Sequence, residues 1–551
     1  MNANLFRIVF NKARGLLMAV AETAAGQGKG QGDGRAPGHA IGQYPHDMRM
    51  GRALANMTYT ATAAIIAVAI IALFTSAEAQ IIADPSAPGT QRAIVLKAPN
   101  GVPLVNIQTP SAAGISRNVF GQFDVQRNGA ILNNSRTNVQ TQLGGWAQGN
   151  PWLATGAAKV ILNEVNSANP SLLKGYVEVA GQKADVIIAN PAGIKVDGAG
   201  FINAGNVVLT TGTPLFNSSG SLDSFRVQRG SVVIEGLGLD TRNASFTDII
   251  ARSVQVNAGL WAIYLRVAGG AGDVYAADPT RITGLADSLA TIGDKPLFML
   301  DVAALGGMYA NHIYLVGSEA GLGVNNSGAI TASGAGAGSE LVLLANGQLV
   351  NRGTLQATGE LQINSTGGIS NGGTLYAGGG ASLSTQGNIS NTSLIAAQGN
   401  VTLQAGGAGS QINSKAGATI LAGVNADGSV GGAGSLTIST GGAAFLNGQT
   451  SAGTVSISAS TLSTDGGSLS GGHLTLAAQA LSNQGGEIVQ TGPGALAINL
   501  PGELHNAGGR IASAGNVLLS AVSLSNNSGQ IAAGSSITVT TDTLTNTQGS
   551  F

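Results

Sequence analysis

Short segments of alternating apolar and polar residues follow one another along most of the chain after residue 80. Alternation of period two is clearest in residues 93–96, 206–210, 231–235 and 253–256. This period is typical of half-buried β-strands, and the dipeptides Asn100-Gly101, Asn128-Gly129 and Asp197-Gly198 predict turns between them. Residues 154–165 are the best candidate for a helix, but their neighbours favour strand. The pattern therefore predicts an all-β chain with no helix longer than two turns after Gln80.

One continuous apolar run stands out from this alternation. Val186-Ile187-Ile188-Ala189 has no polar position, as expected of a strand buried on both faces. It is followed by a turn in which Asn190 can bond its own backbone, Pro191 fixes φ and Gly193 permits a positive φ. By itself this spacing indicates no more than a well-formed turn in a β protein.

From about residue 324 the sequence repeats with a period close to 20 residues. The pattern Leu/Ile-x-Asn recurs at Asn351, Asn371, Asn391, Asn483, Asn506, Asn526 and Asn546. A unit of this length holds three short strands and three turns, which is one coil of a right-handed parallel β-helix, and such coils stack on their neighbours. Roughly 22 coils are expected after residue 80. The recurring Asn is either a ladder of amides bonded from coil to coil or a turn-former, and both roles are structural.

The composition agrees with a thin, stacked β architecture. Gly accounts for 84 of 551 residues and Pro for 15, while aromatic residues make up 4% of the chain and charged residues 10%. An interior built from small aliphatic side chains has no room for many rings. The net charge of −1 argues against nucleic acid as a partner, because no basic surface exists to hold phosphates.

The N-terminal part of the chain has the pattern of an export signal. Residues 61–74 are apolar and are followed by Ala77-Glu78-Ala79, a small-x-small cleavage pattern before Gln80. Fourteen apolar residues are too few for a bilayer core that needs about 20, so a signal peptide over residues 56–79 is favoured over a membrane anchor. Upstream, residues 25–55 are a polar linker, and residues 4–15 are basic and amphipathic, which also suits a helix lying on a membrane.

Residue patterns that carry catalysis or bind metals are not found. The five histidines are scattered, and the sequence has no zinc or calcium spacing, no Gly-x-Ser-x-Gly elbow and no phosphate loop. Asp185 and Asp197 flank the central turn, where solvated strand ends are the simplest reading. We expect neither an enzyme nor a cofactor. The absence of cysteine would suit a chain that crosses a pore unfolded, although chance or a reducing compartment would also explain it.

The stretch around the central turn resembles the secretion domain of the two-partner-secretion exoproteins, the filamentous haemagglutinin and contact-dependent-inhibition family. The family signatures Asn-Pro-Asn-Leu and Asn-Pro-Asn-Gly-Ile correspond to Asn150-Pro151-Trp152-Leu153 and Asn190-Pro191-Ala192-Gly193-Ile194. Each departs from the family at its second Asn, where this chain has Trp152 and Ala192. The likeness covers roughly residues 1–310 and includes Gly259-Leu260-Trp261-Ala262.

The resemblance implies a division of the chain. It predicts an extended signal-peptide region over residues 1–24, a secretion domain over 80–320 and haemagglutinin-type repeats over 321–551. It also implies Sec-dependent export, followed by passage through an outer-membrane β-barrel whose periplasmic domains recognise Asn150, Pro151, Asn190, Pro191, Gly193 and Ile194. Because Asn546 to Phe551 lie in mid-repeat, the sequence is expected to be part of a longer exoprotein.

The resemblance leaves two functions open for the exported rod. The first is a secreted or surface-exposed adhesin of a Gram-negative bacterium, whose receptor on a host or bacterial cell is unknown. The second is the N-terminal part of a toxin-delivery protein of contact-dependent growth inhibition. A third reading, a cytolysin, would need membrane-active segments that are not found.

Overall fold

The computed structural model describes residues 6–11, 16–21, 80–285, 289, 291–335, 339–424 and 434–551, the first two ranges as backbone only. The chain divides into two compact units, 1–76 and 77–551. In the first unit, β1 (Phe6–Asn11) and β2 (Leu16–Ala21) pair antiparallel, so the alternative of an amphipathic helix is wrong for these residues. The predicted linker, the apolar run 61–74 and the cleavage residues Ala77 and Ala79 lie outside the described residues.

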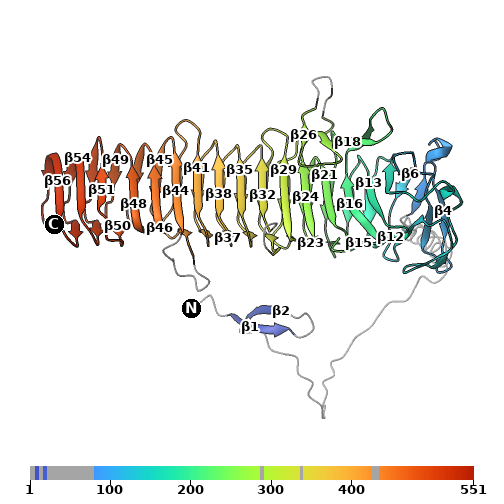
Figure 1. Ribbon diagram of the computed structural model, residues 1–551, viewed down its shortest axis with the longest axis horizontal. Helices are drawn as coiled ribbons and strands as arrows, with labels where there is room; N and C mark the ends of the chain where they lie inside the picture. The colour runs from blue at the N-terminus through green and yellow to red at the C-terminus, as the bar shows by residue number, and fades with distance from the viewer. Residues whose placement is uncertain are drawn as a thin grey trace, which may run out of the picture. The chain divides into compact units, whose positions relative to one another are not determined.

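The second unit is a stack of coils, each contributing one strand to three parallel columns (Figure 1). The prediction of an all-β parallel β-helix is confirmed, and the described residues contain no α-helix, only the short 3-10 turns η1 (Gly89–Gln91) and η2 (Pro151–Leu153). The first column consists of β6 (Ile115–Phe123), β10 (Val160–Val165), β13 (Ala184–Ala189), β16 (Ala204–Thr210), β21 (Phe246–Ala251), β24 (Tyr264–Gly269), β29 (His312–Gly317), β32 (Leu341–Ala345), β35 (Leu361–Ser365), β38 (Ala381–Thr385), β41 (Val401–Ala405), β44 (Ser435–Thr440), β46 (Gln449–Ser458), β48 (Ser468–Ala477), β51 (Leu496–Asn499), β54 (Val517–Ser525) and β56 (Ile537–Thr545).

The other two columns repeat the same parallel pairing around each coil. Four long strands of the first column also belong to one of them: β46 and β48 to the third column, and β54 and β56 to the second. The second column consists of β11 (Ser171–Leu173), β14 (Ile194–Val196), β19 (Ser231–Ile234), β22 (Ser253–Val256), β27 (Phe298–Val302), β30 (Gly323–Asn326), β33 (Leu349–Asn351), β36 (Ile369–Asn371), β39 (Ile389–Asn391), β42 (Ile412–Ser414), β45 (Ala443–Leu446), β47 (Thr461–Ser463), β49 (Ala480–Ser482) and β52 (Glu503–His505). The third consists of β5 (Pro103–Asn106), β7 (Ala130–Asn134), β12 (Tyr176–Gly181), β15 (Ala199–Ile202), β20 (Leu239–Asp240), β23 (Gly259–Trp261), β28 (Gly307–Ala310), β31 (Ala329–Ala332), β34 (Thr354–Ala357), β37 (Thr374–Ala377), β40 (Leu394–Ala397), β43 (Thr419–Ala422), β50 (Glu487–Gln490), β53 (Arg510–Ser513) and β55 (Gln530–Ala533).

Several strands lie outside the columns, so their residues do not contribute to coils as a uniform repeat would require. β3 (Ile81–Ala83) and β4 (Ile94–Lys97) pair antiparallel with β6 and β5, and β8 (Val139–Thr141) forms a hairpin with β9 (Gly145–Ala147). A four-stranded sheet of β17 (Thr213–Phe216), β18 (Leu222–Val227), β25 (Gly272–Tyr275) and β26 (Ile282–Thr283) covers the first column near β21. The solenoid therefore has about 17 turns, so the expected 22 was too many.

One aliphatic core runs through the stack from Ile81 to Ile531. Its members come from every coil, as Leu355, Leu361 and Ile369 do in one repeat, each no more than 1% exposed. The predicted burial of Val186–Ala189 on both faces is confirmed. Val186 and Ile188 lie in this inner core, whereas Ile187 joins a second cluster with Phe225 and Val274 beneath the four-stranded sheet.

Buried asparagines form two hydrogen-bonded columns inside the repeats. Nδ2 of Asn351 donates to Oδ1 of Asn371 at 2.8 Å, and Asn371 donates in the same way to Asn391. Asn326 heads this first column, donating to Asn351 at 2.8 Å. The second column links Asn483, Asn506, Asn526 and Asn546 at 2.7–2.8 Å. Between the two columns, Ser414 and its register partner Leu446 occupy the corresponding positions.

Each amide of these columns, except that of Asn546, also donates to a backbone carbonyl of a neighbouring coil. Nδ2 of Asn371 donates to the carbonyl of Leu394 at 3.0 Å, and Nδ2 of Asn351 donates to that of Thr374 at 3.2 Å. Removing one amide therefore leaves several buried groups without partners. Such groups cost about 1–3 kcal/mol each when they cannot reach water.

Asn371→Ala is expected to lower the free energy of opening of its own coil and its two neighbours by about 2–3 kcal/mol. Hydrogen exchange of peptides covering residues 351–397 measures this locally. Asn364→Ala is the matched control, because Asn364 is exposed on the same coil and its loss should change exchange little. Equal protection in the two variants would contradict a stabilising role for the column.

Candidate functional site: two Asn-Pro turns

The first predicted signature forms a turn whose Asn is buried. Asn150 precedes η2 and is 3% exposed. Its Oδ1 accepts from the backbone N–H of Trp152 at 3.1 Å, while Nδ2 donates to the carbonyls of Ile107 at 2.9 Å and Asn133 at 3.0 Å. Pro151 follows at the first position of the 3-10 turn, where its fixed φ suits the helix and its missing N–H is not needed. Asn150 thus ties this turn to the ends of β5 and β7.

The second signature repeats this arrangement between β13 and β14. Asn190 is fully buried, and its Oδ1 accepts from the backbone N–H of Ala192 at 2.9 Å. Its Nδ2 donates to the carbonyl of Asn169 and to Oγ of Ser171, both at 3.0 Å. Gly193 has φ of 124°, a conformation that glycine adopts readily, and its N–H donates to the carbonyl of Asn190.

The two turns share a mechanism but are separate in the structure. The hydrogen-bond partners of Asn150 and Asn190 have no residue in common. In each turn the Asn side chain fixes the residue two positions later through that residue's backbone N–H. Trp152 and Ala192 supply this N–H as well as any residue would, so the departures from the family pattern leave these bonds intact.

Only the tips of the signatures reach the surface. Pro151 is exposed, the Trp152 side chain is 41% exposed, and Pro191 is half-buried, whereas Ile194 is fully buried. The predicted site residues therefore fall into two groups: buried residues (Asn150, Asn190, Gly193, Ile194) and surface residues (Pro151, Pro191). A partner that touches the folded turns meets Pro151, Trp152 and Pro191, and it reaches the asparagine amides only before these coils close.

A polar cavity of about 520 Å³ lies beside Pro191. Arg117 pairs with Glu164 at 2.8 Å and Arg226 with Asp273 at 2.8 Å, so two of its three arginines are neutralised. Hydrogen bonds from Ser86, together with one from Asn166, hold the pKa of Asp84 below its usual range. This cavity offers paired charges rather than a reactive group.

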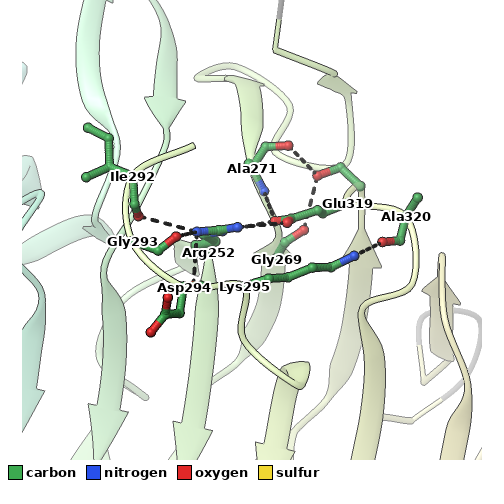
Figure 2. Close-up of polar contacts among 10 residues, drawn as sticks. Arg252, Gly269, Ala271, Ile292, Gly293, Asp294, Lys295, Glu319 and Ala320 are labelled. Carbon is green, nitrogen blue, oxygen red and sulfur yellow. Dashed lines mark hydrogen bonds and ion pairs between the residues drawn. The ribbon is translucent and has the colours of Figure 1, made fainter. Parts of the chain in front are cut away.

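The most buried ion pair joins Arg252 to Glu319, a pairing that no sequence pattern indicates (Figure 2). The side chains are 5% and 15% exposed, and Arg252 Nη2 lies 2.9 Å from Glu319 Oε1. Nη1 of Arg252 also donates to the carbonyls of residues 292, 293 and 294 at 3.2–3.3 Å. The pair thus fastens the segment that precedes β27 onto the solenoid.

Burial opposes ionisation of Glu319, but hydrogen bonds outweigh it. Arg252 and the backbone N–H of Ala271 both donate to the carboxylate. These bonds and the nearby charge of Arg252 hold the pKa of Glu319 below its ordinary value of 4.5. Among the described residues, no cluster of three or more His, Cys, Asp or Glu side chains could hold a metal ion, and none of the described helices is both long and apolar enough to cross a membrane.

Comparison with known families accounts for most of the chain. Residues 79–343 match the TPS secretion domain, residues 1–43 the extended signal peptide of the type V secretion system, and residues 345–393 and 494–551 the haemagglutinin repeat. The chain belongs to the two-partner-secretion exoprotein family. It is thus a secreted exoprotein with a signal peptide, exported to the cell surface of Gram-negative bacteria.

Curated relatives of this exoprotein include a toxin and a tRNA nuclease. It is 50% identical over 357 residues to toxin CdiA of Yersinia pestis, an alignment covering 65% of this chain and 10% of that protein. It is 41% identical over 361 residues to tRNA nuclease CdiA-2 of Burkholderia pseudomallei (strain 1026b), covering 65% and 11%. The chain spans about a tenth of the length of these relatives. The crystal structure of the filamentous hemagglutinin secretion domain aligns with 30% identity and a TM-score of 0.46, covering 61% of this chain and 99% of that one.

Proposed function

We propose that residues 80–320 are an export domain. After the chain has crossed the inner membrane by the Sec pathway, this domain binds the periplasmic domains of an outer-membrane β-barrel transporter. The match to the secretion-domain model carries this proposal. Residues 1–24 and 56–79 then act as the extended signal region and the signal peptide, cleaved between Ala79 and Gln80, with 25–55 as their linker. Residues 321–551 follow the secretion domain as repeat coils that are exported behind it.

The buried amides suggest how the predicted signature residues take part. Asn150 and Asn190 are accessible to a transporter while the chain is unfolded. Once the first coils form, their side chains become buried and hold the turns by hydrogen bonds. Folding of these coils then presents the edge of the column as a template on which later coils add. Each added coil buries aliphatic surface, and this free energy favours outward movement of the chain without a nucleotide.

We propose that the exported rod is a filamentous haemagglutinin-like adhesin, and its match to the haemagglutinin repeat supports this reading. The second candidate is the N-terminal part of a contact-dependent growth inhibition protein, which the names of the relatives CdiA and CdiA-2 favour. In either role the coils form a long rod that extends from the cell and binds through its surface rather than by catalysis. Nucleic acid is not a partner of this weakly charged rod.

Deleting residues 140–200 tests the export proposal. Cells that carry the cognate transporter should then retain the chain, and the immunoblot signal in the medium should fall to background. Removing residues 361–380, one whole repeat coil, is the matched control and should leave export within about twofold, because the neighbouring coils can restack. Undiminished export of the chain that lacks both turns would contradict the proposal.

A further inference from the structure

Three ring-bearing side chains lie in register on successive coils of the first column. Phe246, Tyr264 and His312 begin β21, β24 and β29 and are partners in the parallel ladder (Figure 1). The ring centroids of Phe246 and Tyr264 are 5.1 Å apart, and those of Tyr264 and His312 are 5.7 Å apart. Phe246 and Tyr264 remain 37% and 38% exposed. An aromatic stack is thus presented to solvent in a chain with few aromatic residues.

Stacking of the solenoid does not require this feature. Ile313 pairs with Leu341 on the next coil, so Glu340 is the register partner of His312. Leu341 pairs with Leu361 on the coil after that, so Glu360 is the register partner of Glu340. The next two coils thus carry carboxylates where these three coils carry rings. The stack is therefore a local addition to the surface.

The rings border a hollow with a charged rim. Its volume is about 370 Å³, and it is lined by Phe246, Tyr264, Arg266, Asp278, Thr280, His312 and Tyr314. Arg266 is fixed by two bonds to Asp248, at 2.6 and 2.7 Å. Both bonds from Thr280 to Asp278 go to Oδ1, which leaves Oδ2 available to accept from a ligand. The hollow thus combines aromatic faces with polar groups that are already held in place.

We propose that this hollow binds a carbohydrate, with sugar rings lying against Tyr264 and its neighbours and sugar hydroxyls bonded to the polar rim. The apolar face of a pyranose ring packs on an aromatic face, and its hydroxyls match planar carboxylate and guanidinium groups. An organic cation fits less well, because the guanidinium of Arg266 already lies 4.9 Å from the Phe246 ring centroid and would repel it. A purely apolar ligand would leave Arg266 and Asp278 desolvated.

This inference rests on the proposed export, since only a chain displayed outside the cell meets extended glycans. The full chain, purified from the medium, is applied to an array of oligosaccharides ending in hexose, N-acetylhexosamine or sialic acid. The affinity for the best-bound sugar is then measured by calorimetry. Binding of at least one oligosaccharide is expected, weakened at least about tenfold by Tyr264→Ala and several-fold by Asp278→Asn.

Tyr309→Ala is the matched control. Tyr309 is also exposed and stacked, on Trp261, but it lies in the third column away from the hollow. Its loss should change the affinity by less than about twofold. The inference is overturned if no oligosaccharide binds above background, if Tyr264→Ala binds as well as the unaltered chain, or if choline chloride displaces the sugar.

Export of each variant is measured alongside binding, which separates this inference from the proposed function. Normal export of Tyr264→Ala with lost sugar binding supports the inference. Poor export of Tyr264→Ala, with normal export of Tyr309→Ala, would assign the aromatic stack to contact with the transporter and would overturn the inference. If the unaltered chain is not exported, the proposed function fails, and binding is tested on refolded full chain.

Discussion

Asn190→Ala is expected to reduce the amount of chain that reaches the medium at least about tenfold. The substitution removes two donated bonds and one accepted bond from a fully buried turn. Leaving these groups unpaired costs about 2–4 kcal/mol, which lowers the equilibrium ratio of folded to unfolded first coils by roughly 30- to 900-fold. If these coils are the template on which the later coils fold, few chains with unfolded first coils will complete export. Immunoblotting of medium and periplasm in the same culture measures the effect.

Two further variants make this result specific. Asn364→Ala removes an exposed Asn from a repeat coil and should leave export unchanged. Ala192→Asn restores the residue that the family pattern has at this position, and it should also export normally, because only the backbone N–H of residue 192 is used. If Asn190→Ala exports as well as these two controls, the buried amide has no part in export.

Arg252→Met is expected to lower the free energy of opening of the segment before β27 by about 3–5 kcal/mol. The change removes the partner of Glu319 and the donor to three backbone carbonyls, leaving a buried carboxylate without its hydrogen-bonded counter-charge. Hydrogen exchange of peptides covering residues 291–302 and 312–324 measures the loss. Arg510→Met is the matched control, because Arg510 pairs with Glu487 where both side chains are more than 40% exposed, and such pairs contribute no more than about 1 kcal/mol.

In the unaltered chain, lowering the pH should destabilise the segment before β27 in part as Arg252→Met does. The folded pKa of Glu319 lies below its ordinary value of 4.5, so its ionisation stabilises the folded state above that value. This stabilisation is lost as the pH falls through the folded pKa. Protection of the segment should therefore decrease below about pH 4.5, and in Arg252→Met this acid-dependent decrease should be absent. An equal decrease in both proteins would contradict the assignment.

Local patterns predicted the elements well where one physical cause dominated. The apolar run at Val186 predicted burial on both faces, and the structure supplies both: the inner core on one side and the four-stranded sheet on the other. The turn residues Asn190 and Gly193 lie where their bonding and conformational preferences placed them. The repeat period likewise predicted parallel coils, because each repeat must bury its apolar face on the next.

Features that depend on where the chain leaves the solenoid could not be predicted. Residues of β17, β18, β25 and β26 lie outside the coils, so a uniform period overcounted the turns. Asn326 heads the first amide column but lies 25 residues before Asn351, outside the regular interval. The same insertions separate Tyr264 from His312 and Arg252 from Glu319 along the chain, and only the folded register brings these residues together.

We propose that the chain crosses the outer membrane unfolded and forms its solenoid outside. Limited proteolysis on the two sides of that membrane tests it most directly, with the periplasmic chain trapped in cells that lack the transporter. Residues 321–551 should be digested rapidly in the periplasm, and the same residues should resist digestion strongly once exported. Equal resistance on both sides would show that the coils fold before they cross and would contradict the claim.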